Sequence, residues 1–113
     1  MTFNFVIEYG NQISVPPELV VPYREISQQL GSPTHMTCVV TASPLPSELY
    51  WEHKGDRLVD SDKFKIMESD IGNYQRTISA QVNDITDSDF GIYKCIVRND
   101  LGQAEDRVTI SGG

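Results

Sequence analysis

The spacing of Cys38, Trp51 and Cys95 constrains the fold of this chain more than any other feature of its sequence. The chain has two cysteines and one tryptophan, and Tyr93 lies two residues before the second cysteine. Residues two apart in a strand point to the same face, so Tyr93 and Cys95 are expected to share one face. This arrangement is typical of a sandwich of two sheets in which a buried tyrosine bonds to backbone upstream.

The residues that lead to Cys95 form the motif D-x-G-x-Y-x-C, which begins at Asp89. Aspartate can bond nearby backbone amides, and glycine adopts backbone conformations that other residues avoid. Asp89 and Gly91 therefore predict a tight turn before the strand that carries Tyr93. We expect Asp89, Gly91, Tyr93 and Trp51 to have structural roles.

The two cysteines allow one disulfide, Cys38–Cys95, which would close a loop of 95 − 38 = 57 residues. Chain-entropy estimates give a bond of this loop length about 4 kcal/mol of stability. A disulfide indicates an oxidising compartment, and hence an extracellular domain. The alternative is a pair of buried, reduced thiols in an intracellular domain.

Length and charge exclude several classes of protein. A chain of 113 residues is expected to form one domain, and no apolar run is long enough to cross a bilayer. The net charge of −7 argues against binding to nucleic acid or to anionic lipid. Residues 1–12 lack the basic start of a secretory signal, so a secreted or membrane-attached protein would contain this chain as a piece.

Short runs of alternating apolar residues, separated by turn residues, predict an all-β domain over residues 16–111. Residues 1–15 are expected to be a tail or the remnant of a preceding domain. Phe3, Phe5, Ile7 and Tyr9 alternate as in a strand, and Pro16-Pro17 marks the expected boundary. Pro22 predicts a kinked first strand that changes sheets. The short run at residues 57–59 and the kinked first strand favour the intermediate type of sandwich.

Two longer segments make a family resemblance specific. They are ELYWEHKGDRLVDSDKFKIMESDIGNY, from residue 48, and VNDITDSDFGIYKCIVRNDLGQAED, from residue 82. With the lead-in Val15-Pro16-Pro17, they resemble an I-set immunoglobulin domain over residues 15–110. In particular, they resemble the third, membrane-proximal domain of the lachesin, IgLON and Dpr-interacting neuronal proteins. The resemblance implies an immunoglobulin-like antiparallel Greek-key sandwich with one disulfide between its sheets.

The chain departs from this family's pattern at two positions. Ala80 stands where these domains usually carry leucine, so Met36 or Met67 is expected to fill the core instead. Lys63 stands where an arginine often pairs with the motif's aspartate. A Lys63–Asp89 pair would lack the planar, two-pronged geometry of arginine.

No arrangement of residues predicts catalysis, a cofactor or a bound metal. His35 and His53 have no further ligand nearby in the sequence, and a metal site needs three or four converging ligands. Asp84, Asp87 and Asp89 could hold calcium through their oxygens, but turn and capping roles are the preferred interpretation. The protein is therefore expected not to be an enzyme.

A candidate interface follows from strand parity. If Trp51 and Cys95 face inward, their neighbours along the two strands face outward. A tyrosine and an isoleucine ringed by charges of both signs make a plausible contact patch. An ordinary solvated sheet face is the alternative. The candidate residues are Tyr50, Glu52, Lys94, Ile96 and Arg98, which Glu105 and Arg107 are expected to join.

The resemblance implies a non-enzymatic extracellular module of a cell-surface adhesion protein. Its expected partners are other cell-surface immunoglobulin proteins and neighbouring immunoglobulin domains of the same chain. In the resembled group the outermost domain recognises partners, and the third domain mainly acts as a spacer. The alternative function is an intracellular structural module of a muscle-type scaffold with reduced cysteines.

Overall fold

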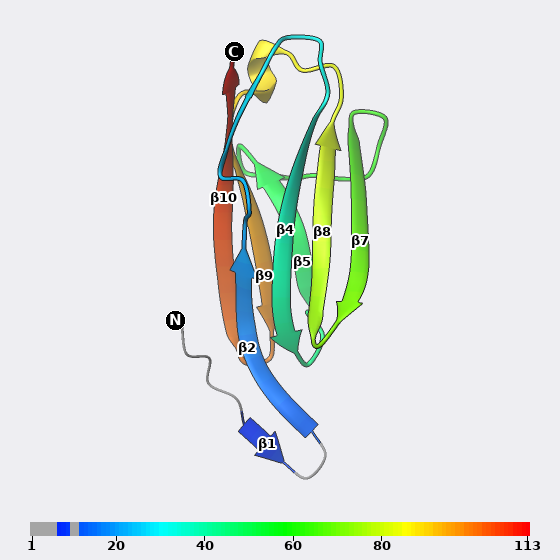
Figure 1. Cartoon of the computed structure of the whole chain (residues 1–113), viewed down its shortest axis with the longest axis vertical. Coiled ribbons are helices and arrows are strands. Elements are labelled where there is room, and N and C mark those ends of the chain that lie inside the picture. The colour runs from blue at the N-terminus through cyan, green and yellow to red at the C-terminus, as the bar shows by residue number, and fades with distance from the viewer. Residues whose placement is uncertain (1–6, 10–11) are drawn as a thin grey trace.

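Two packed β-sheets form the domain in the computed structural model, which describes residues 7–9 and 12–113 (Figure 1). One sheet has the strand order β1-β2-β4-β8-β7, and the other has the order β3-β10-β9-β5-β6. The predicted two-sheet all-β sandwich is confirmed. The elements are β1 (Ile7–Tyr9), β2 (Gln12–Val20), β3 (Glu25–Gln28), β4 (Thr34–Ser43), β5 (Glu48–His53), β6 (Asp56–Arg57), β7 (Phe64–Gly72), β8 (Gln75–Val82), the 3-10 turn η1 (Asp87–Asp89), β9 (Gly91–Asn99) and β10 (Gly102–Gly112).

The chain changes sheets between β2 and β3, at the kink predicted for Pro22. It continues in the same direction, so β3 pairs parallel with β10, and Ile26 lies opposite Ile110. The other strand pairs within the described residues are antiparallel. The expected antiparallel sandwich therefore contains one parallel pair at its edge.

Strand β1 is the edge strand of its sheet and pairs antiparallel with the start of β2, with Tyr9 opposite Gln12. The strand predicted across Ile7 and Tyr9 is confirmed, whereas the expectation for Phe3 and Phe5 lies outside the described residues. β2 then runs through Pro16-Pro17, where its register with β4 shifts. Since proline has no amide N–H for the ladder, the two prolines occupy a bulge within one strand.

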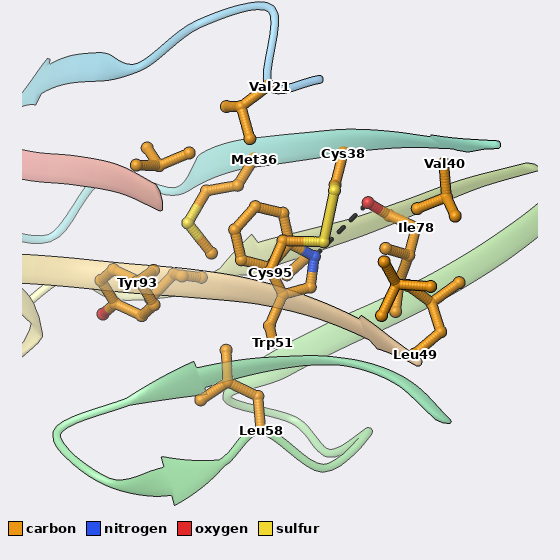
Figure 2. Packing of buried hydrophobic residues seen from close by; sticks show 14 of the residues in the cluster. Val21, Met36, Cys38, Val40, Leu49, Trp51, Leu58, Ile78, Tyr93 and Cys95 are labelled. Carbon is orange, nitrogen blue, oxygen red and sulfur yellow. Dashed lines mark hydrogen bonds between the residues drawn. A yellow bond between two sulfur atoms is a disulfide. The ribbon is translucent and has the colours of Figure 1, made fainter. Parts of the chain in front are cut away.

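Alternating side chains of β4 enter the core, as their spacing predicts. Met36, Cys38 and Val40 are each at most 1% exposed. The Cys38–Cys95 disulfide joins β4 to β9 and so links the two sheets beside Trp51 (Figure 2). The indole N–H of Trp51 donates a hydrogen bond to the carbonyl oxygen of Ile78, 3.4 Å away (Figure 2).

Met36 compensates for the small side chain of Ala80. The two residues lie opposite each other on β4 and β8, and both are buried. Met67 is 65% exposed, so the alternative that Met67 fills the core is wrong. Its position in the edge strand β7 points it toward solvent.

Candidate interaction surface

The motif that precedes Cys95 forms a corner between η1 and β9. The hydroxyl of Tyr93 donates a hydrogen bond to the backbone oxygen of Asp89, 2.6 Å away. Gly91 between them has a φ of +123°, which favours glycine. The predicted tight turn and buried tyrosine are present, and Tyr93 is fully buried.

The carboxylate of Asp89 is held by three donors. Lys63 Nζ forms an ion pair with it, and the backbone N–H of Thr86 donates a bond of 2.8 Å. The Thr86 hydroxyl donates a third bond of 3.2 Å. Burial by itself raises the pKa of Asp89, but the bonds from Lys63 and Thr86 bring it below its ordinary value. The expected Lys63–Asp89 pair is therefore present.

The ionisation states of Asp89 and Tyr93 favour the hydrogen bonds of the corner. Burial, together with the charge of Asp89, raises the pKa of Tyr93 above its ordinary value, so its hydroxyl stays a neutral donor.

Among the residues that the structure describes, no three His, Cys, Asp or Glu side chains gather as a metal site would require. In that same part of the chain, no helix is long and apolar enough to span a membrane.

The outer face of β5, β9 and β10 carries the residues of the candidate interface. Strand pairing places them in three rows across these strands. Lys94, Arg98, Glu105 and Arg107 are exposed, and Tyr50 and Glu52 are half-buried. The rows are Glu48–Arg98–Gln103, Tyr50–Ile96–Glu105 and Glu52–Lys94–Arg107. We call this surface the β5–β9–β10 face.

Ile96 differs from the expectation, because it is only 6% exposed. It has the outward parity of Lys94 and Arg98, but it lies on the central strand between Tyr50 and Glu105. Long side chains on both flanking strands can cover a residue at this position. The expectation that Ile96 offers accessible apolar surface is therefore wrong.

Arg57 is an additional member of this face that the sequence interpretation missed. Its guanidinium lies over the ring of Tyr50, 4.4 Å from the ring centroid, in a cation–π contact. The hairpin of β5 and β6 brings it there, since Arg57 pairs with Glu52. The turn Lys54-Gly55-Asp56 was the signal in the sequence that could have found it.

An ion pair and a hydrogen bond hold Arg98 at one end of the face. At the other end, which we call the open end, the cations are not in ion pairs among the described residues. Arg98 lies 3.6 Å from Glu48 and donates to Gln103 at 2.9 Å. Lys94 and Arg107 are neighbours in register and form no ion pair within the described residues. They border a shallow hollow of about 280 Å³. Arg24, Glu105 and Asp106 line the same hollow.

The comparisons with known proteins place the chain in a family. The profile of the immunoglobulin domain matches residues 16–99. The chain belongs to the immunoglobulin domain family. It is 32% identical over 93 residues to Neogenin of Rattus norvegicus, which is 82% of the chain and 6% of Neogenin.

Relatives of this immunoglobulin domain occur in proteins of two kinds. The cell adhesion molecule Dscam1 of Drosophila melanogaster is 27% identical over 95 residues, 80% of the chain and 4% of Dscam1. The muscle M-line assembly protein unc-89 of Caenorhabditis elegans is 34% identical over 96 residues, 85% of the chain and 1% of unc-89. The chain spans a small fraction of each of these relatives.

A solved structure shows the same fold. The structure of Dpr2 Ig1-Ig2 in complex with DIP-Theta Ig1-Ig3 matches with a TM-score of 0.83 at 21% identity. The match covers 88% of this chain and 33% of the other chain. At this identity the likeness establishes the fold, and the activity must be argued from the surface of this immunoglobulin domain.

Proposed function

We propose that this immunoglobulin domain is a non-enzymatic module of an extracellular adhesion or recognition protein at the cell surface. The observation that carries the proposal is the Cys38–Cys95 disulfide, whose two residues are fully buried between the sheets. Structural disulfides persist in oxidising compartments and are rare in the cytosol. The likeness to the cell adhesion molecule Dscam1 supports the same function.

The domain would act within an array of immunoglobulin domains. Its relatives are far longer than this chain, which fits a module joined to others. The sequence motifs favour the membrane-proximal domain of the lachesin, IgLON and Dpr-interacting group. In that position the domain would space outer domains from the membrane, and any contact of its own would use the β5–β9–β10 face.

The open end of this face would contact another cell-surface immunoglobulin protein. Lys94 and Arg107 are exposed cations without ion pairs inside the described domain, while Arg57 on Tyr50 provides a flat, partly apolar neighbour. Interface centres favour aromatic residues and arginine. A second copy of the domain or a different immunoglobulin protein could supply the matching carboxylates.

Charge reversal on this face tests the proposed contact. We expect Lys94→Glu and Arg107→Glu to weaken association at least about tenfold, because each places a like charge against the partner. Association is measured by sedimentation of the domain and by binding to a panel of cell-surface immunoglobulin ectodomains. Lys65→Glu is the control, since Lys65 is exposed on β7 of the opposite sheet.

Equal behaviour of all three variants would contradict a contact through this face and would leave the spacer role. A loss with Lys65→Glu alone would place the contact on the opposite sheet.

A second function is favoured by the likeness to unc-89, a muscle M-line assembly protein. In that case the domain would be an intracellular structural module, and Cys38 and Cys95 would be reduced thiols. The redox state of the two cysteines in the natural protein separates the two functions.

A further inference from the structure

Strand pairing arranges several cations in one line across a whole sheet. Lys94 on β9 lies opposite Arg107 on β10, and Glu52 on β5 lies on the other side of Lys94. Arg57 on β6 follows Glu52 in the same line. Arg24 comes directly before the edge strand β3 and lines the same hollow as Lys94 and Arg107. We call Arg57, Lys94, Arg107 and Arg24 the cation row.

The cation row crosses the sheet from one edge to the other. Its members belong to, or directly precede, strands β6, β9, β10 and β3, and β5 lies between β6 and β9. Neighbouring strands lie about 4.8 Å apart, so the row spans about 19 Å. It is therefore longer than a single small anion and runs at right angles to the strands.

Two members of the row are like charges placed directly opposite each other. Lys94 and Arg107 are exposed, and neither forms an ion pair in the part of the chain that the structure describes. Opposite charges at a cross-strand position stabilise a sheet, whereas like charges destabilise it. The sheet thus retains two adjacent positive charges that its own carboxylates do not pair with, which favours a site for an anion from outside.

Two shallow hollows follow the row. One, of about 280 Å³, is lined by Arg24, Lys94 and Arg107, together with Glu105 and Asp106. The other, of about 410 Å³, contains Lys54 and Lys94 in its lining. Lys94 lines both hollows, so they follow one another along the row. A compact ligand favours an enclosed pocket, and a shallow track of this kind suits an extended chain better.

The carboxylates near the row limit which polyanions fit. Glu52 interrupts the row, and Glu105 lies next to Ile96 in the adjacent row of the face. A ligand must therefore carry its charges at intervals along a narrow chain, unlike a duplex or a bilayer. The carboxylates of the opposite sheet have little effect, because sheets pack about 10 Å apart and charges beyond about 8 Å are screened at physiological ionic strength.

We propose that the cation row binds a linear sulfated polysaccharide, which lies across the strands from Arg57 to Arg24. The planar fork of an arginine matches two oxygens of one oxyanion, and lysine adds a point charge. The inference rests on the proposed function for its extracellular location and adds a second class of partner to the β5–β9–β10 face. Since Lys94 and Arg107 belong to both contacts, the polysaccharide competes with a protein partner for the open end.

Binding of the intact chain to immobilised heparin, a sulfated polysaccharide, tests the proposal. We expect binding at about 50 mM salt that is lost on chemically desulfated heparin, which keeps its carboxylates. Lys94→Gln and Arg107→Gln should each weaken binding about fivefold and reduce the slope of log affinity against log salt by about one. Lys65→Gln is the matched control, because it removes one exposed cation from the opposite sheet and should bind like wild type.

Three results would overturn the proposal: no binding of the wild-type chain to heparin, equal binding to heparin and desulfated heparin, or an equal loss in Lys65→Gln and Lys94→Gln. Each would leave the proposed protein contact standing if Lys94→Glu still weakened association with an immunoglobulin partner. Reduced cysteines in the natural protein would instead contradict the proposed function and leave the heparin result unchanged.

Discussion

Asp89 shows how one side chain of the motif stabilises the domain. Its carboxylate accepts bonds from Lys63 and from both the amide and hydroxyl of Thr86, and its backbone oxygen accepts the Tyr93 hydroxyl. Lys63 also donates to the backbone oxygens of Asn83 and Asp84. One ammonium and one carboxylate thus fasten the start of β7 to the turn before β9.

The lowered pKa of Asp89 predicts an acid-dependent loss of stability. The stabilisation is complete above the unfolded pKa of aspartate, about 3.9, and is lost as the pH falls through the lower folded value. Asp89→Asn should therefore destabilise the domain at pH 7 by about 1–3 kcal/mol, because it weakens hydrogen bonds to a charged group whose partner Lys63 is partly exposed. It should also lose less further stability than wild type between pH 5 and pH 2.

Urea unfolding at several pH values checks this prediction. Asp62→Asn is the matched control, because the Asp62 side chain is fully exposed and its nearest ion pair is a loose 3.8 Å contact with Lys65. A similar pH profile for Asp89→Asn and wild type would contradict the role given to Asp89.

Strand β9 is the element on which the core and the candidate face meet. Tyr93, Cys95 and Val97 face the core, and Lys94 and Arg98 face solvent. Ile96 breaks this alternation by being buried on the outer face. The strand is therefore apolar on both sides at its centre, and a substitution there affects folding before it affects binding.

Ile96 substitutions test that claim about β9. We expect Ile96→Val to cost about 0.5–1.5 kcal/mol of unfolding free energy, as in other buried sites. Ile96→Asp should cost several kcal/mol, because it buries an unpaired charge. Thermal and urea unfolding measure both effects. Nearly unchanged stability of Ile96→Asp would mean that Ile96 is accessible and that the face has an apolar centre.

In β9, the features that the sequence predicts correctly depend on the spacing of residues close together in the chain. Tyr93 and Cys95 share a face because they are two residues apart, and Asp89 lies close enough in sequence to receive the Tyr93 hydroxyl. The burial of Ile96 and the stacking of the His53 ring on Tyr93 depend on strands distant in sequence. Parity gives the direction of a side chain, but register and the length of neighbouring side chains decide whether it is covered.

Charge is unevenly distributed over the whole molecule. The net charge is −7, yet most of the basic residues belong to the sheet of β3, β10, β9, β5 and β6 or lie beside its strands. These are Arg24, Lys54, Arg57, Lys94, Arg98 and Arg107. The opposite sheet and its loops have Lys63, Lys65 and Arg76, and each of these lies within 4 Å of a carboxylate. Arg24 and Arg98 are also paired, with Asp106 and Glu48. Among the described residues, the cations without an ion pair are therefore Lys54, Arg57, Lys94 and Arg107, which all belong to this sheet or its turns.

We propose that the molecule is an extracellular immunoglobulin domain, in which the Cys38–Cys95 bond is closed in the natural protein. The most direct test is to count free thiols in the protein isolated from its natural source. The protein is alkylated at once under denaturing conditions, and mass spectrometry identifies the alkylated cysteines. We predict that neither Cys38 nor Cys95 is alkylated before reduction and that both are alkylated after it. Two alkylated cysteines before reduction would contradict the claim and favour the intracellular structural module.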